Sequence, residues 1–203
     1  MVLCTYCNKK FGCKKIHEHY IECIPAHNNS KTGYLVMFSG YSISQKYYFM
    51  YAFIEETTKL SNIDKFLRNK WCECCNHKSE FRYMLSNIPK KTLINNFDIG
   101  DLIVYTYDFG STTTIFIKIL KKINSNNTKN TKNTKNIKPY VDIDPVLYND
   151  EHIINCTTEN CINKAIYYIN YQPLCFNCTE ENEDNESKLL IVNSPRTGEC
   201  GYE

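Results

Sequence analysis

The residues near the N-terminus that could bind a metal are three cysteines and a histidine. Cys4 and Cys7 have two residues between them, and His19 stands four positions before Cys23. A short turn can aim two thiolates at one point, and positions i and i+4 of a helix share one face. Four such ligands can complete the tetrahedron that zinc prefers. We therefore predict a zinc site formed by Cys4, Cys7, His19 and Cys23.

Residues 1–30 resemble the zinc finger of two cysteines and two histidines, in the variant that ends in cysteine, the CCHC type. The middle of the unit is one residue shorter than usual. Phe11 and Ile16 would form a small core that folds only with metal. Such a finger binds nucleic acid or protein, or docks on the rest of its own chain. Its candidate nucleic-acid-binding residues are Lys9, Lys10, Lys14 and Lys15.

A second set of cysteines lies near the C-terminus. Cys156 and Cys161 are followed by Cys175 and Cys178, and the strand-like run 165–169 lies between the two pairs. Two cysteine turns separated by a hairpin are typical of a zinc ribbon, here at about residues 153–180. A site of four cysteines leaves no open coordination position, so this metal is expected to be structural rather than catalytic.

The central run 72–77 contains three more cysteines and a histidine. It permits a tentative third metal site with ligands drawn from Cys72, Cys74, Cys75, His77 and Cys200. The cysteines could instead be buried free thiols, which pack as small apolar groups, or form a vicinal disulfide. A catalytic Cys75 activated by His77 is a further option. Asp108 is a candidate to orient that histidine, but an Asp at this position more often caps its own turn.

The cysteine content sets the expected compartment. The chain has 203 residues and 12 cysteines, yet its first residues show no secretion signal and no apolar run has membrane-spanning length. Thiols in a reducing compartment favour metal over disulfides, so we expect an intracellular protein with no membrane partner. An apolar fraction of 42% is enough for a core, and a net charge of +2 argues neither for nor against nucleic acid.

The elements that must position these residues follow from periodicity. β-branched and aromatic runs predict strands, Leu60, Ile63 and Leu67 recur at helical spacing, and Ser61 is the expected N-cap. The predicted strands are 34–38, 46–54, 81–84, 102–107, 113–120 and 189–192, with a helix at about 61–71 and a turn at 39–42. The low-complexity Asn/Thr/Lys segment 121–138 is expected to be a disordered insertion.

Three segments carry a resemblance to a known family. They are residues 63–81, which begin Ile-Asp-Lys-Phe-Leu-Arg, residues 105–114, which contain Tyr-Asp-Phe-Gly, and residues 192–202, which begin Val-Asn-Ser-Pro-Arg. Together they resemble the plasmid pRi ORF-like domain, an insertion-element passenger. The match is to a bacterial uncharacterised subgroup with a cysteine ribbon. The resemblance covers residues 34–203 and implies a compact α+β domain with an antiparallel or mixed sheet and packed helices. It implies little about activity, and residues 111–114 replace the Trp and His that often follow the family's Tyr-Asp-Phe-Gly.

The sequence thus predicts a non-enzymatic protein that binds two zinc ions, or three with the central site. Its expected partner is nucleic acid or another protein, reached through the N-terminal finger, and no small-molecule substrate is indicated. The alternatives are a thiol-dependent enzyme centred on Cys74, Cys75 and His77, and a structural protein of a virus or mobile element. None of the common nucleotide-binding or hydrolase motifs is present.

Overall fold

The fold is seen in a computed structural model of residues 1–203. The structure describes residues 2–4, 7–11, 15, 18–19, 22–23, 32–72, 75–124, 143–148, 153–180 and 188–199. For residues 2–3 and 143–148 it describes the backbone alone. Most of the predicted insertion 121–138 lies outside these ranges, so its expected disorder stays a prediction.

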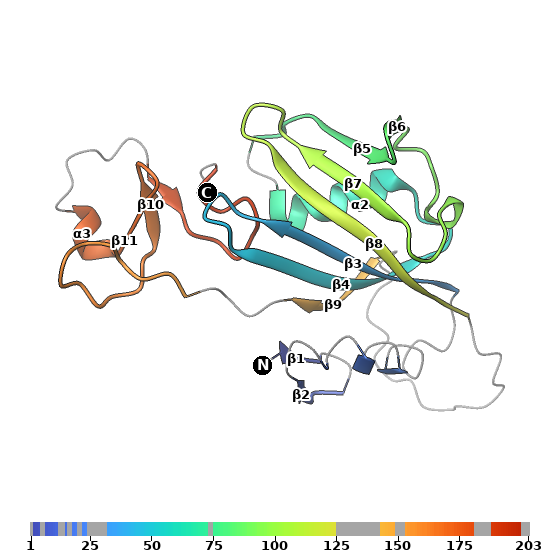
Figure 1. The fold of residues 1–203 in the computed structure, drawn as a ribbon, viewed down its shortest axis with the longest axis horizontal. Helices are drawn as coiled ribbons and strands as arrows, with labels where there is room; N and C mark the ends of the chain where they lie inside the picture. Colours follow the sequence, from blue (N-terminus) through green and yellow to red (C-terminus); the bar gives the residue numbers. More distant parts are fainter. Residues whose placement is uncertain are drawn as a thin grey trace.

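A seven-stranded antiparallel sheet forms the centre of the molecule (Figure 1). The strand order is β6-β5-β7-β8-β3-β4-β9. The strands are β3 (Gly33–Tyr41), β4 (Tyr47–Glu55), β5 (Ser79–Tyr83), β6 (Ser86–Ile88), β7 (Leu102–Tyr107), β8 (Thr113–Ile123) and β9 (Ile143–Tyr148). A short 3₁₀ turn, Ile94–Asn96, precedes β7. The strands predicted at 34–38, 46–54, 102–107 and 113–120 form the hairpins β3–β4 and β7–β8, which lie next to each other in this sheet.

The β3–β4 hairpin turns later than predicted. We expected the turn at residues 39–42, but pairing continues to Tyr41 opposite Tyr47. The chain reverses over residues 42–46, where the backbone N–H of Lys46 donates to Ser42 Oγ at 3.2 Å. Gly40 is therefore a strand residue. A Cβ there would lie 2.9 Å from the Thr114 carbonyl oxygen and 3.2 Å from Pro195, so the glycine permits close packing rather than a turn.

The predicted helix is present but shorter. Helix α2 (Leu60–Leu67) continues into a π-helical turn, Arg68–Cys72. Its N-cap is Lys59, without a side-chain cap, so the expectation that Ser61 caps the helix is wrong. The backbone N–H of Leu60 instead bonds to the Thr92 carbonyl oxygen at 2.9 Å. A neighbouring loop thus satisfies an N–H group that a cap would otherwise bind.

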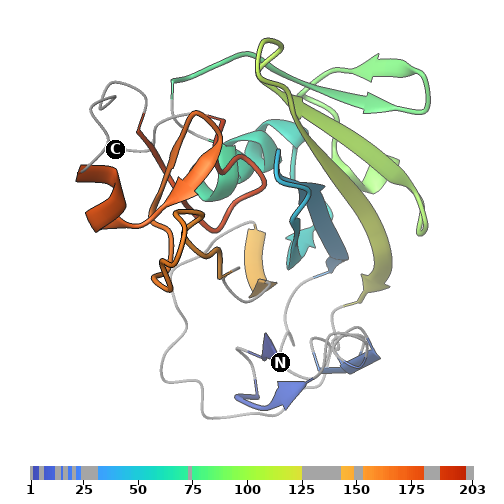
Figure 2. The ribbon, with the colours of Figure 1, turned by 60° about the vertical axis from the view of Figure 1, so that its left-hand side comes forward.

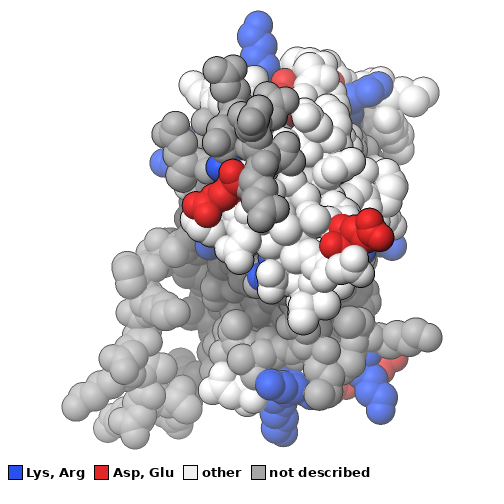
Figure 3. All heavy atoms as spheres, turned by 90° about the vertical axis from the view of Figure 1, so that its left-hand side faces the viewer, with Lys and Arg blue, Asp and Glu red and all other residues white. Residues whose placement is uncertain are grey.

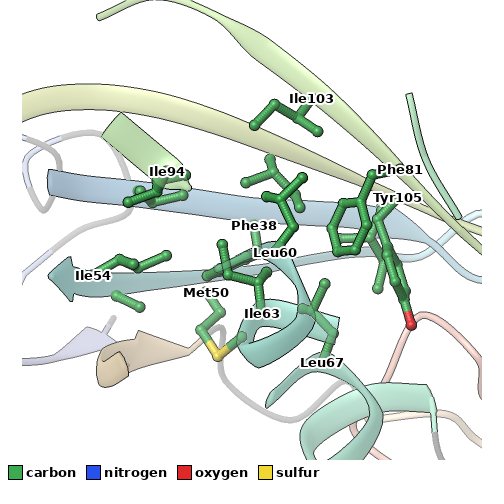
Figure 4. Packing of buried hydrophobic residues seen from close by; sticks show 14 of the residues in the cluster. Phe38, Met50, Ile54, Leu60, Ile63, Leu67, Phe81, Ile94, Ile103 and Tyr105 are labelled. Carbon is green, nitrogen blue, oxygen red and sulfur yellow. The ribbon is translucent and has the colours of Figure 1, made fainter. Parts of the chain in front are cut away.

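Helix α2 packs on one face of the sheet and builds the main core. Leu60, Ile63 and Leu67 are fully buried there. Figure 4 shows them beside side chains that strands β3, β4, β5 and β7 contribute. The labelled partners from these strands are Phe38, Met50, Ile54, Phe81, Ile103 and Tyr105. We conclude that the fold is a sheet-rich α+β structure.

A smaller three-stranded sheet lies near the turn of the β3–β4 hairpin (Figures 1 and 2). It consists of β10 (Tyr167–Ile169), β11 (Gln172–Leu174) and β12 (Leu189–Leu190), and a short helix α3 (Phe176–Glu180) follows β11. The hydroxyl of Tyr168 lies 3.4 Å from that of Ser44, which joins this unit to the hairpin. The part of the chain that is described contains no helix long and apolar enough to cross a membrane.

The opposite face of the large sheet is covered in part by the N-terminal unit. This unit contains the two-residue strands β1 (Val2–Leu3) and β2 (Lys10–Phe11). Cys4 and Cys23 belong to one buried cluster with Leu35, Tyr51 and Phe53 of strands β3 and β4. The finger therefore docks on the domain, which is one of the alternatives that the sequence left open.

Candidate metal centres

The N-terminal ligands predicted from the sequence lie together. The Sγ atoms of Cys4 and Cys23 are 3.9 Å apart, and Cys7 Sγ lies 3.3 Å from His19 Nε2. One ligand atom from each of these residues lies within 4.8 Å of all the others. These atoms are near enough to share a single tetrahedral ion with the usual Zn–S and Zn–N lengths of about 2.0–2.3 Å.

Local backbone structure positions this first cluster. Asn8 adopts a positive φ of 56°, and its N–H bonds to the Cys4 carbonyl oxygen at 2.8 Å. This tight turn brings Cys4 and Cys7 to one side. The ring of Phe11 stacks on that of His19 with centroids 3.9 Å apart, so an apolar residue fixes the orientation of a ligand. Ile16, the other expected core residue of the finger, lies outside the described residues.

The second predicted set also comes together. Cys161 Sγ lies 3.7 Å from Cys175 Sγ and 3.8 Å from Cys178 Sγ, and Cys156 completes a group within 4.8 Å. Cys156 and Cys161 flank a turn in which Asn160 has a positive φ of 60°. Cys178 is carried by α3. The hairpin β10–β11 thus lies between the two cysteine pairs, and the first pair is spaced more widely than usual, so the zinc ribbon itself stays a prediction.

Crowding of thiols gives both clusters a reason to bind a cation. Burial, together with the neighbouring Cys4 and Cys7, raises the pKa of Cys23 to about 12. In the second cluster, burial opposes ionisation of Cys156, but hydrogen bonds led by that from Thr158 lower its pKa to about 6. A hydrogen bond from Thr158 favours the thiolate of Cys178, yet Cys175 and burial raise its pKa to about 12. In the second cluster the pKa values of Cys156 and Cys175 are thus lowered and those of Cys161 and Cys178 are raised, and a bound dication would stabilise every thiolate.

The central residues behave differently from the two clusters. Cys72 is fully buried in the main core, Cys75 is exposed, and His77 is half-buried. Within the described ranges, the groups of three or more possible metal ligands are the two above. Cys74 and Cys200 lie outside these ranges. The third metal site therefore stays a prediction, and Cys72 is buried among the apolar side chains of the main core.

A buried ion pair, which the sequence did not predict, joins segment 105–114 to segment 192–202. Arg196 is fully buried, and its Nη2 donates to Asp108 Oδ2 at 2.6 Å. Its Nη1 donates to the Ser111 carbonyl oxygen at 2.8 Å and to Thr113 Oγ1 at 3.0 Å. The hydrogen bond from Arg196 lowers the pKa of Asp108. Asp108 also accepts the backbone N–H of Gly110 at 3.0 Å, which confirms the expected turn cap.

A second polar network centres on Asp64, at the helix–sheet junction. Its carboxylate accepts hydrogen bonds from Tyr105 at 2.8 Å, Ser79 at 2.5 Å and Lys90 at 3.1 Å, and it pairs with Arg68 at 3.3 Å. Burial would raise the pKa of Asp64, but these hydrogen bonds, led by that of Ser79, lower it. The sequence did not reveal this network because Ser79, Lys90 and Tyr105 are far from Asp64 in the chain.

The lysines expected to contact nucleic acid are accessible where they are described. Lys9, Lys10 and Lys15 are exposed, and Lys14 lies outside the described residues. Figure 3 shows basic side chains projecting from the bottom of the molecule, at the level of the N-terminal unit in Figure 1. Docking on the sheet therefore leaves the side chains of Lys9, Lys10 and Lys15 in solvent.

Comparisons with known proteins add little to this picture. No family model matches the chain, and no curated protein matches it. Among solved structures, it is similar to a protein of unknown function from Methanosarcina mazei Go1, at 16% identity and a TM-score of 0.44. That match covers 58% of this chain and 68% of the other. So distant a likeness assigns neither a fold nor a function.

Proposed function

We propose that this protein is a non-enzymatic zinc-binding interaction module, in which two structural zinc ions fix two accessory units on a central sheet. The observation that carries the proposal is the convergence of two four-residue ligand sets, each within 4.8 Å. A zinc ion with four protein ligands has no open position for a substrate or an activated water. Both ions would therefore hold structure and take no part in a reaction.

The surroundings of each cluster support a structural role. The first cluster packs on Leu35, Tyr51 and Phe53, which are at most 4% exposed. The second is packed with Ile169 and Leu174, which are at most 4% exposed. Each metal would thus order a small unit that is too short to form a core of its own, and its binding energy would become folding energy.

One observation favours the alternative of a thiol-dependent enzyme. His77 Nδ1 lies 3.6 Å from Asp108 Oδ1, and Cys75 is exposed two residues before the histidine. However, the other carboxylate oxygen of Asp108 is held by the buried Arg196, so a structural contact fully accounts for the aspartate. A catalytic Cys75 would react with iodoacetamide much faster than an ordinary thiol, and replacing His77 by alanine would slow that reaction. We expect neither.

The metal content tests the proposal directly. Purified protein, washed with a weak chelator, should contain two zinc ions per chain. Replacing Cys161 or Cys4 by serine should remove one ion in each case, because a three-ligand remnant binds zinc far more weakly. Cys75→Ser is the matched control and should keep both ions. Fewer than two ions in the native protein would refute the proposal, and loss of an ion from the control would show that the central cysteines also bind metal.

The expected partner is nucleic acid or protein, and the exposed lysines of the finger favour nucleic acid. Each phosphate that a lysine neutralises on duplex DNA steepens the dependence of log affinity on log salt by about 0.9. Replacing Lys9 and Lys10 by alanine should therefore reduce that slope by roughly two units. If binding instead depends on apolar residues and ignores salt, the partner is a protein.

The resemblance to the plasmid pRi ORF-like domain remains part of the proposal. The Arg196–Asp108 pair supports it, because this contact gives the Val-Asn-Ser-Pro-Arg and Tyr-Asp-Phe-Gly motifs a physical reason to occur in one chain. The resemblance carries no activity with it.

A further inference from the structure

The face of the large sheet that carries the finger is only partly covered by it. Side chains alternate between faces along each strand, and Ile103, Tyr105 and Tyr107 of β7 point into the α2 core. Their neighbours Leu102, Val104 and Thr106 must therefore lie on the finger side. The finger covers one corner of this side, around Leu35, Tyr51, Phe53 and Ile123. We call the remainder the open face.

Aromatic rings gather on the open face. Tyr41 and Tyr47 are paired across β3 and β4, with ring centroids 5.1 Å apart. The ring of Tyr47 stacks on that of Phe49 with centroids 6.0 Å apart. Two residues before Tyr41 on β3, Ser39 is paired with Phe49 of β4 on one side and with Phe116 of β8 on the other. Tyr41 is 55% exposed and Tyr47 is 39% exposed, so flat apolar surface is available to a partner.

Cationic side chains border these rings. Across the sheet, Phe116 of β8 is paired with Val104 of β7, which is paired with the exposed Arg82 of β5. The adjacent row contains the exposed Lys118, paired with Met37 and Leu102. Lys46, also exposed, immediately precedes Tyr47. The acidic group on strand β5, Glu80, accepts a hydrogen bond from Asn87 at 3.1 Å.

A shallow hollow of about 250 Å³ lies at the end of the aromatic group. Tyr41 and Phe116 contribute to its lining, so it is continuous with the open face. The other lining groups include the polar side chains of Ser42, Gln45, Thr112 and Thr114, and Glu199 also lies there. Hydroxyl and amide groups both donate and accept hydrogen bonds, which suits the edges of a nucleobase better than an apolar side chain.

We propose that the open face binds single-stranded nucleic acid, with bases stacked on Tyr41, Tyr47 and Phe116 and phosphates near Lys118 and Arg82. Stacking on aromatic rings within a cationic surface is the general way in which single strands are held, since every base has a flat π-face. The proposal deepens the interaction role proposed above and rests on it. It places the strand on the sheet rather than on the finger alone.

The chemistry of the face favours this occupant over others. A duplex presents its phosphates outward and hides the flat faces of its bases, so it could not use the exposed tyrosine rings. A second copy of the chain, packed face to face by a twofold axis, would bring Lys118 and Arg82 of both copies into one interface. Burying like charges in this way costs binding energy.

Fluorescence anisotropy with labelled 12-nucleotide oligo(U) and oligo(dT) tests the proposal on the full zinc-loaded protein. At about 50 mM salt both probes should bind, and a duplex of the same length should bind more weakly. Tyr47→Ala should weaken binding about 5- to 150-fold, the usual range for one lost base–aromatic stack, whereas Tyr47→Phe should retain it. Lys118→Gln should lower the salt slope by about 0.7, the value for one phosphate of a single strand.

Matched variants separate this face from the rest of the surface. Tyr171 is 72% exposed on the hairpin of the small sheet, so Tyr171→Ala should leave binding unchanged. Glu199→Gln removes a negative charge from the hollow and should tighten binding. Zinc content and thermal unfolding of every variant show whether it is folded. Size-exclusion chromatography shows whether the protein forms a dimer that Tyr47→Ala disrupts.

Several results would overturn the proposal. These are no binding of either oligonucleotide at about 50 mM salt, a preference for duplex, or a dimer built on Tyr47. Binding that survives Tyr47→Ala and Lys118→Gln but is lost when Lys9 and Lys10 are replaced would place the strand on the finger instead. If two zinc ions per chain are present while the oligonucleotides fail to bind, the structural zinc sites stand and the open-face site alone is wrong.

Discussion

Replacing Arg196 by methionine should destabilise the domain by about 3 kcal/mol. The change removes one charge-assisted hydrogen bond, worth about 1.5–3 kcal/mol, and two further bonds from the guanidinium, worth about 1 kcal/mol each. Breaking one partner of a buried ion pair generally costs about 3–5 kcal/mol, because the other charge stays buried. Asp108 is 11% exposed at its side chain, so water recovers part of this cost. We therefore expect a value at the lower end of the range.

Urea denaturation of the zinc-loaded protein measures this effect. For a chain of this size the slope m is about 2–3 kcal/mol per molar urea, so the midpoint should fall by roughly 1–1.5 M. Arg82→Met is the matched control, because Arg82 is exposed on β5, and its effect should stay within about 0.5 kcal/mol. Adding Asp108→Asn to Arg196→Met removes the unpaired charge and should restore part of the stability.

The pH dependence gives an independent check on the same pair. Arg196 lowers the pKa of Asp108 below its ordinary value of 3.8. The contact therefore contributes stability that is present above about pH 4 and is lost as the pH falls through the folded-state pKa. The variant without Arg196 should lose less stability between about pH 4 and pH 2 than the native protein does. A loss of less than about 1 kcal/mol at neutral pH, with unchanged m, would refute our account of this pair.

Two other changes test the scaffold. Asp64→Asn should cost about 1.5–3 kcal/mol, because the amide cannot replace the charge that accepts from Tyr105, Ser79 and Lys90; a thermal shift below 2 °C would contradict this. Deleting residues 124–136 should change thermal stability little, since the Asn/Thr/Lys composition buries no apolar surface and loop length has a small entropic effect; a large fall in stability would show that the segment is packed.

The two clusters of candidate metal ligands and the main strands were predictable because their signals are local. Cys4 and Cys7, or Cys175 and Cys178, are close enough in the chain to reveal their joint use. The hairpins followed from β-branched and aromatic runs. Gly40 misled the prediction because a glycine after a strand resembles a turn residue. A glycine is needed at this position because Pro195, 155 positions away in the chain, packs closely against it.

The contacts that the sequence did not reveal join residues far apart in the chain. Arg196 and Asp108 are 88 positions apart, and Asp64 and Tyr105 are 41 apart. Strand β9 was also not predicted. It follows the low-complexity segment in the chain and pairs with the distant strand β4 at the edge of the sheet. A polar side chain can hydrogen-bond to many different partners, so its position in the sequence does not identify the partner. In a strand, by contrast, the alternation of apolar residues indicates which face each side chain is on.

The hydrophobic pattern of strands β3 and β4 already indicated that another unit packs on the sheet. Strands β3 and β4 are apolar at nearly every position from Tyr34 to Phe38 and from Tyr47 to Ile54, whereas a sheet with one solvated face alternates polar and apolar residues. Such runs indicate that apolar neighbours cover much of both faces. Helix α2 covers one of them, and the N-terminal unit covers a corner of the other. Under the proposed function a zinc ion orders that unit, so its loss would uncover Leu35, Tyr51 and Phe53 and would destabilise the sheet as well as the N-terminal unit.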